Sequence, residues 1–294
     1  MTALRLKSPA AGGLYSAARR IRDWQIWTLP VLPQSYISAV IALAGGAVIA
    51  VGLSVQWRSL HIAVFAALLA CGIIAIESTR AVKEAHGSLV RDLQSVWYLA
   101  IAIVLPPFYA LAAPVPLLVY KLWRQRGMVV YRRVFSNATI SLAYGCAAWL
   151  FHSVPSAIAG TTPGTGTHVL AWTGVVAGCG VLAWAANVGL ILLAMRVTDR
   201  VTRVRDMFGS REGLVSDLIE LTFGVSLALV VAINPVLMAL ALPSVVLYRR
   251  YLMQAQLVAQ ARMDSKTGLL NAGTWRREAE VEFFRALPAR RRSR

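Results

Sequence analysis

Acidic residues are scarce in this sequence: 13 Asp and Glu stand against 30 Lys and Arg in 294 residues. Charged residues of both signs make up only 15% of the chain, whereas hydrophobic residues make up 57% and the mean hydropathy is +0.60. Such a composition lies far from that of water-soluble globular domains. The scarcity of charge therefore predicts a polytopic membrane protein.

Cysteine is also rare, with only Cys71, Cys146 and Cys179, each inside an apolar run. None has a partner at disulfide or metal-ligand spacing, so we expect free thiols packed in the core. Residues 1–35 lack the short apolar stretch and small-residue cleavage site of a signal peptide. We expect this basic segment to stay attached, on the cytoplasmic side.

The sequence lacks the patterns typical of nucleic-acid binding and of enzyme catalysis. The net charge of +17 invites a nucleic-acid interpretation, but the basic residues form short clusters between apolar runs, with no basic stripe carrying interleaved aromatics. No His/Asp/Glu cluster or Ser/His pair stands at a spacing useful for catalysis. The sequence therefore predicts the lipid bilayer as partner, with no nucleic acid, no metal, no cofactor and no catalytic residue.

Apolar runs long enough to cross a bilayer are present, since about 20 residues rising about 1.5 Å each span the hydrocarbon. Four such runs are 36–55, 60–76, 138–151 with its flanks, and 168–195.

Two further apolar regions are interrupted by proline. Region 96–120 contains Pro106 and Pro107, and region 218–248 contains the pair Asn234 and Pro235. Proline removes an amide donor and clashes with the preceding turn, so each region is either one kinked span or a hairpin of two short helices.

The basic residues favour hairpins. All of them except Arg58 fall before residue 36, in 80–91, 121–133 and 196–211, or after 248. If both regions double back, these clusters share the cytoplasmic side, as the positive-inside rule requires. We therefore predict an all-α transmembrane bundle of about eight membrane-embedded helices in the plasma membrane, with both termini cytoplasmic. Whether the hairpins span fully or are re-entrant stays open.

The two interrupted regions resemble each other. SLVRDL at 88–93 resembles GLVSDL at 213–218 at an offset of 125, and PFYALAAPVPLLVY at 107–120 resembles PVLMALALPSVVLY at 235–248. The pattern predicts a transmembrane domain, 36–248, made of repeats 36–120 and 137–248, as in membrane folds with parallel repeats.

Polar residues in or near the spans are the candidate site of such a domain. Asp92 and Asp217 occupy equivalent positions at the cytoplasmic ends of the hairpins, and Glu220 and Asn187 lie deeper. An intramembrane acid is costly and is a functional candidate for that reason. For Asp92 and Asp217 the alternative is capping of a first helical turn.

The C-terminal stretch DSKTGLLNAGTW, 264–275, resembles the opening of the GGDEF domain of diguanylate cyclases. The matching positions are Asp264, Thr267, Gly268, Leu269 and Asn271. Lys266, Gly273 and Trp275 depart from the usual D-x-L-T-G-L-x-N-R-R-x-F pattern. The variant opening and the preceding layout look like those of actinobacterial membrane-anchored members.

This resemblance implies a membrane sensor with a helical linker, 249–263, followed by the start of a GGDEF domain, 264–294. The helix 245–263 has an imperfect coiled-coil seam and is expected to form a homodimer that transmits an unknown small-molecule or membrane signal. The 294 residues contain no GG(D/E)EF motif, so the family's catalytic residues have no counterparts. We expect a truncated module that is not an enzyme by itself. The alternatives are a transporter-like protein that binds a ligand at the repeat interface, and a fragment of an active diguanylate cyclase.

Overall fold

The computed structural model describes residues 25–78, 94–124, 129–160, 162–163, 166–198, 211–244, 246–247, 250–251, 271–273, 275–276 and 279. Within these ranges every regular element is a helix, which confirms the all-α class. In chain order they are η1 (Gln25–Thr28), α2 (Val31–Ser54), α3 (Ser59–Glu77), α5 (Ser95–Val104), α6 (Pro107–Ala112), α7 (Pro114–Arg124), α8 (Val130–Ser153), α9 (Ser156–Ala159), α10 (Thr167–Thr198), α12 (Arg211–Ile233) and η2 (Pro235–Leu237).

Among the described residues, five helices are long and apolar enough to cross a membrane. Four of them, α2, α3, α8 and α10, match the four predicted runs, although α2 ends at Ser54, one residue before the end of the first run. The fifth is Leu214–Ile233 of α12, so the first half of the second interrupted region is not the short helix we expected. These long apolar helices suggest membrane insertion, whereas the total of eight membrane-embedded helices stays a prediction.

The first interrupted region doubles back, as the charge pattern predicts. α5 ends at Val104, before Pro106 and Pro107, and α6 and α7 return from there. Nζ of Lys121, in α7, donates a hydrogen bond to Oε1 of Gln94, which precedes α5, at 2.6 Å. In one kinked span these two residues would lie about 40 Å apart at about 1.5 Å per residue. The ten residues of α5 cover about 15 Å, roughly half of the hydrocarbon.

The second interrupted region breaks where the sequence indicates. α12 ends at Ile233, and Asn234 takes an extended conformation with φ −156° and ψ 117°. Its side-chain oxygen accepts a hydrogen bond from the backbone N–H of Val236 at 2.9 Å, which caps the short helix η2. A reversal of the chain after η2 stays a prediction. The residues that would form its returning half, 240–248, belong to a second compact unit made of residues 74–93 and 240–294.

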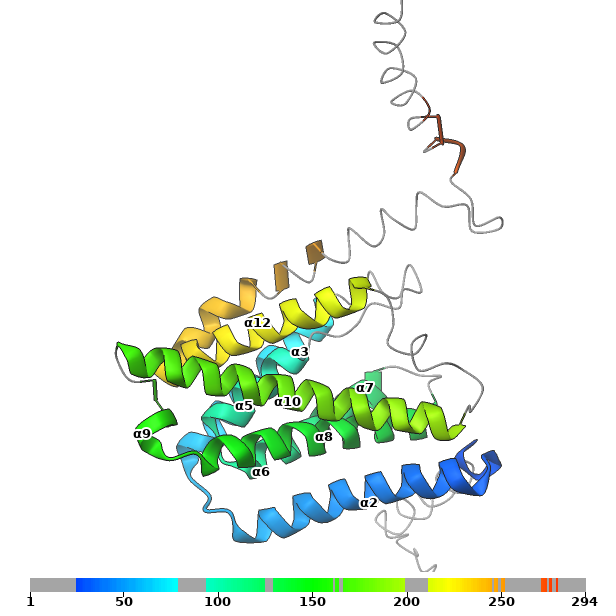
Figure 1. Cartoon of the computed structure of the whole chain (residues 1–294), viewed down its shortest axis with the longest axis horizontal. Helices are drawn as coiled ribbons and strands as arrows, with labels where there is room; N and C mark the ends of the chain where they lie inside the picture. The colour runs from blue at the N-terminus through cyan, green and yellow to red at the C-terminus, as the bar shows by residue number, and fades with distance from the viewer. Residues whose placement is uncertain are drawn as a thin grey trace, which may run out of the picture. The chain divides into compact units, whose positions relative to one another are not determined.

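The first compact unit, residues 1–73 and 94–239, is organised around α8. This helix packs against α2, α5, α6, α7 and α10, and Figure 1 shows it lying between α2 and α10. The fully buried aromatic side chains of the described residues come from α5, α6, α8 and α10; they are Trp97, Tyr98, Tyr109, Phe151 and Trp172. At the end of α8, Nε2 of His152 donates to the carbonyl of Leu105 at 2.8 Å and so pairs a carbonyl at the end of α5.

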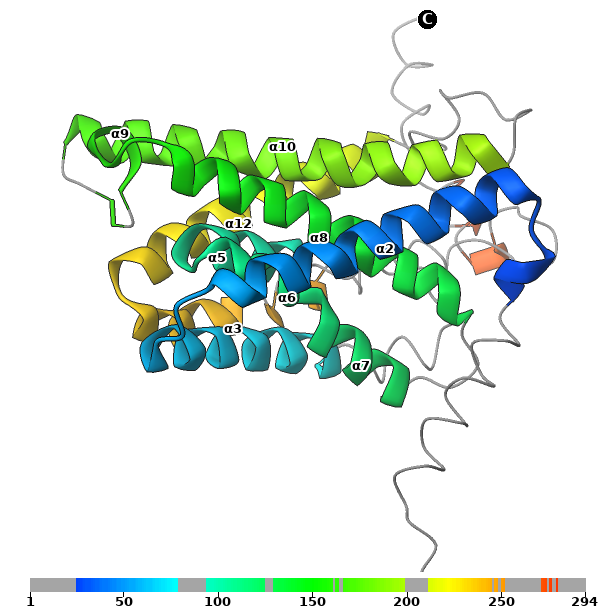
Figure 2. The ribbon, with the colours of Figure 1, turned by 90° about the horizontal axis from the view of Figure 1, so that it is seen from below.

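α2 and α8 run in the same direction side by side (Figure 2). Each has 24 residues, and Tyr36 and Phe135, the sixth residue of each, have ring centroids 6.0 Å apart. These two helices are the first spans of the two predicted repeats, so equivalent helices pack in parallel and nearly in register.

One expectation about the core is wrong. Cys71 and Cys179 are buried, but Cys146 is exposed on the outer face of α8. In a membrane helix the side facing lipid is as apolar as the side facing protein, so an apolar run does not tell which face is packed.

Candidate functional site

Glu220 is the most buried of the predicted site residues that the structure describes. It lies on α12 with 9% of its surface exposed, and its Oε1 accepts a hydrogen bond from the backbone N–H of Ser95 at 3.0 Å. Ser95 is the first residue of α5, whose opening N–H groups have no partner within the helix. Glu220 therefore supplies from α12 the negative charge that the N-terminus of α5 favours.

The contact joins positions that the predicted duplication makes equivalent, since Ser95 and Glu220 are 125 residues apart. One turn further on, a Cβ added at Gly224 would lie 3.1 Å from Cδ2 of Leu99, which is again the partner at an offset of 125. α5 and α12 thus run in parallel and in register, with the absent side chain of Gly224 allowing their close approach. Glu220 lies at the interface between the predicted repeats.

A second polar group lies at the same end of α5. Gln94 is 5% exposed and Lys121 is 8% exposed. Oε1 of Gln94 accepts from Nζ of Lys121 at 2.6 Å and from the hydroxyl of Tyr98 at 3.4 Å, whereas its Nε2 has no hydrogen-bond partner. Sequence reasoning identified neither residue as part of a site. Lys121 begins the basic cluster 121–133, which the sequence predicts to be solvated. The apolar, proline-rich sequence just before it is the signal that it belongs to the returning helix.

Two other predicted site residues, Asn187 and Asp217, make side-chain hydrogen bonds between helices. Oδ1 of Asn187, on α10, accepts a hydrogen bond from Oγ1 of Thr139, on α8, at 2.9 Å. Oδ2 of Asp217, on α12, accepts one from Nε1 of Trp184 at 3.0 Å. Asp217 is the seventh residue of α12, so it does not cap the first turn of that helix. Asp92 lies outside the described residues.

The family opening motif is described only at Asn271. The backbone N–H of Trp275 donates to the carbonyl of Asn271 at 2.9 Å, the spacing of a helical hydrogen bond. Asp264, Thr267, Gly268 and Leu269 lie outside the described residues.

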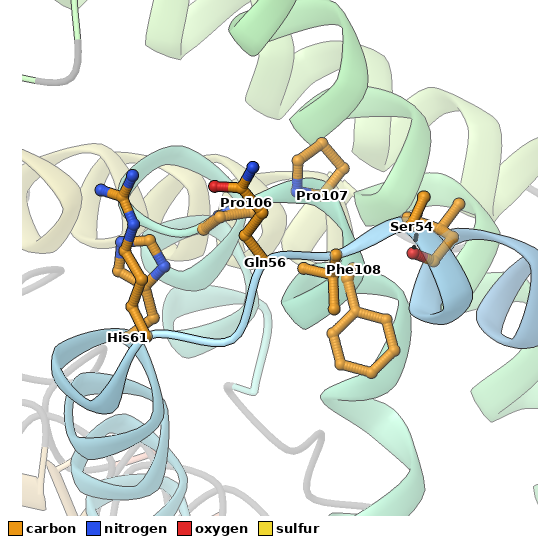
Figure 3. A pocket seen from close by; sticks show the side chains of 9 residues that line it. Ser54, Gln56, His61, Pro106, Pro107 and Phe108 are labelled. Atoms are coloured by element: carbon orange, nitrogen blue, oxygen red, sulfur yellow. Dashed lines mark hydrogen bonds between the residues drawn. The ribbon is translucent and has the colours of Figure 1, made fainter.

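Sequence reasoning missed a hollow of about 390 Å³ at the opposite end of α5. Its walls come from two places, the connection from α2 to α3 and the proline break between α5 and α6 (Figure 3). The lining residues are Val51, Ser54, Val55, Gln56, Arg58, His61, Pro106, Pro107 and Phe108. Figure 3 shows Gln56 and Pro106 among the side chains drawn around the hollow, with His61 in the first turn of α3.

Aromatic rings pack behind this hollow around Tyr109. Its ring centroid lies 5.1 Å from that of Phe65, 5.5 Å from Phe108 and 6.1 Å from His61. Tyr109 is 1% exposed, and its hydroxyl has no hydrogen-bond partner. Nδ1 of His61 and Nε1 of Trp97 are also buried without partners. Such groups are rare in folded proteins and require an explanation, for example a bound molecule.

Comparisons with protein-family models, curated proteins and solved structures found no match for this chain. Over the part of the chain that the structure describes, no three His, Cys, Asp or Glu side chains lie close enough to hold a metal ion. The features that carry chemistry are therefore the buried acid between α5 and α12 and the hollow at the far end of α5.

Proposed function

We propose that this protein is the membrane-embedded sensory module of a GGDEF-type signalling protein. In this proposal it crosses the cell membrane several times through about eight embedded helices, with both termini in the cytoplasm. The hollow receives the signal, and the chain after α12 passes it to the segment that resembles the opening of a GGDEF domain. A homodimer formed through helix 245–263 is the proposed output state.

The observation that carries this proposal is the hydrogen bond from Ser95 to Glu220. The end of α5 leads through Leu105 into the proline break that forms one wall of the hollow. The start of α5 is held by a carboxylate of α12, the helix that precedes the C-terminal segment. A displacement at the hollow therefore has a rigid route along α5 to α12, because a ten-residue helix moves as one body.

Coupling can be tested in a chimera that joins residues 1–271 to a complete GGDEF domain, expressed in a bacterium without other diguanylate cyclases. We expect Glu220→Ala to change the cellular cyclic di-GMP level at least threefold, because α5 and α12 lose their polar connection. The matched control is Ser226→Ala, which removes from the same helix an exposed hydroxyl bonded to its own backbone. Equal cyclic di-GMP levels in all three chimeras would refute the coupling.

These 294 residues contain no GG(D/E)EF motif and are proposed not to make cyclic di-GMP by themselves. The purified protein incubated with GTP and Mg²⁺ is expected to yield no cyclic di-GMP by liquid chromatography. A complete diguanylate cyclase serves as the positive control. Formation of the product by the purified chain would overturn this part of the proposal.

The buried polar groups at the repeat interface favour one alternative, a transporter-like protein. Glu220 is buried there, Gln94 and Lys121 are buried at the same end of α5, and transporters of parallel repeats place their ligands between the repeats. Proteoliposomes with a trapped pH dye decide between the two. A proton or ion flux that Glu220→Gln abolishes would favour transport, whereas the sensory proposal expects no flux above that of empty liposomes.

A further inference from the structure

We propose that the hollow binds the anionic group of a small ligand, a carboxylate or a phosphate, and that Arg58 is its principal counter-charge. This inference rests on the proposed sensory function and names the chemical class of its signal. Its four polar lining residues, Ser54, Gln56, Arg58 and His61, come from the end of α2, the connection that follows it and the first turn of α3.

Arg58 is the first reason for choosing an anion. It is exposed, and it has no carboxylate partner anywhere in the described ranges. The nine lining residues include no Asp or Glu, so Arg58 is the only one that carries a full charge. A guanidinium presents several donors in a planar fork that matches a carboxylate or a phosphate in two parallel hydrogen bonds.

The position of Arg58 in the sequence supports the same conclusion. Every other basic residue belongs to a cluster at the end of the spans that the positive-inside rule makes cytoplasmic. Arg58 stands alone between two apolar helices, at the other end of α2 and α3. The positive-inside rule therefore does not account for Arg58, whereas a role in binding an anion does.

An unpartnered polar atom among the lining residues is the second reason. Nδ1 of His61, which lines the hollow, is buried without a hydrogen-bond partner. The hydroxyl of Tyr109 is in the same state, and the ring of Tyr109 contacts the rings of His61 and Phe108, both of which line the hollow. A ligand oxygen held by Arg58 would offer Nδ1 of His61 the acceptor that it lacks.

The remaining walls indicate what else the ligand carries. Val51, Val55, Pro107 and Phe108 make one side apolar, and Trp57 packs its ring edge-on against Phe108 at 5.1 Å. The volume of about 390 Å³ falls in the lower part of the range of small-molecule sites. We therefore expect a small amphipathic anion, with its charged group at Arg58 and its apolar part against Phe108.

Two sources offer this chemistry, a soluble anion and the phosphate of a lipid headgroup, and the experiment separates them. The full chain is reconstituted in nanodiscs of phosphatidylcholine, and its thermal unfolding midpoint is followed by tryptophan fluorescence. The soluble probes are phenylacetate, its neutral isostere phenylacetamide, and glycerol 3-phosphate. The lipid arm replaces phosphatidylcholine by phosphatidylglycerol. A ligand that binds the folded state alone raises the midpoint.

The variants are chosen to separate binding from folding. Arg58→Ala is expected to weaken the apparent Kd of the responding anion at least tenfold, and Arg58→Lys less, because a lysine keeps the charge but not the fork. Arg132→Ala, which removes an exposed arginine near the other end of the bundle, is the matched control and should leave Kd unchanged. Tyr109→Phe should raise the unfolding midpoint without ligand and leave Kd unchanged, since the lost hydroxyl has no partner and does not line the hollow.

Each result decides something. Arg58-dependent stabilisation by phenylacetate or glycerol 3-phosphate, but not by phenylacetamide, establishes a soluble anion. Arg58-dependent stabilisation by phosphatidylglycerol alone establishes a lipid phosphate. If none of the three anions stabilises the wild type more than Arg58→Ala, the inference is wrong. Binding that leaves the cyclic di-GMP output of the chimera unchanged would instead refute the sensory function and leave the site intact.

Discussion

Replacement of Glu220 by alanine is the sharpest test of how the bundle is held together. In the folded protein this side chain is 9% exposed and accepts the N–H of Ser95 at 3.0 Å. Glu220→Ala removes the acceptor and leaves the opening amide of α5 without it. Glu220→Gln keeps an oxygen at the same reach and removes only the charge.

Two independent scales bound the loss of stability. Removing a helix cap typically costs about 0.5–2 kcal/mol. Hydrogen bonds between membrane helices contribute about 0.6 kcal/mol on average and up to about 1.7 kcal/mol. The acceptor here is a carboxylate in a buried place, which favours the upper part of both ranges. We expect the free energy of unfolding to fall by about 1.5 kcal/mol in Glu220→Ala and by about half of that in Glu220→Gln.

Hydrogen–deuterium exchange in detergent or nanodiscs locates the effect. A loss of about 1.4 kcal/mol corresponds to about a tenfold faster exchange of the amides that open with the first turn of α5. Peptides from α2 and α8 should exchange as in the wild type, and Ser226→Ala on the same helix should change nothing. An unchanged exchange rate at Ser95 in Glu220→Ala, or a uniform increase throughout the protein, would refute the capping argument.

Two further predictions concern helix packing. Gly180→Val, on α10, places a Cβ against Leu221 of α12 and should lower the free energy of unfolding by about 1–3 kcal/mol. Gly178→Val on the same helix is the control, because a Cβ there meets nothing within 4 Å, and it should leave the thermal unfolding midpoint unchanged. The pair Thr139 and Asn187 should show a coupling energy of about 0.6 kcal/mol in a double-mutant cycle of Thr139→Val and Asn187→Leu; strict additivity would mean that their 2.9 Å contact contributes nothing.

The helical architecture could be predicted from sequence because the relevant signals are long or redundant. A span of about 20 apolar residues is hard to miss. The reversal between α5 and α7 followed from two prolines together with the side on which Lys121 and its basic neighbours had to lie. Residue-level orientation was harder, since Cys146 shows that the apolar face toward lipid and the apolar face toward protein look alike in sequence.

The site was predictable only in part, for a related reason. Glu220 was a candidate because a carboxylate inside a span is costly. Its partner could not be inferred, because a backbone N–H at a helix start leaves no mark on the sequence. The hollow joins Gln56, Arg58 and His61 to Pro106 and Phe108, which are separated by more than forty residues. In the sequence, the isolated position of Arg58 was the one signal for this hollow. It points to a site only once the structure shows that the connection between α2 and α3 faces Pro106 and Pro107.

The parallel, in-register packing of α5 against α12 has a historical meaning if the two repeats arose by duplication. Equivalent helices facing each other are what two identical subunits would present across a symmetric contact. Identical subunits carry the same residue at equivalent positions, so they could not place a serine in one helix opposite a glutamate in the other, as Ser95 and Glu220 do here. Joining the two copies in one polypeptide removes that constraint. One copy can keep a bulky Leu99 while the other makes room with Gly224. The two sides of a contact that was once symmetric can then evolve different residues.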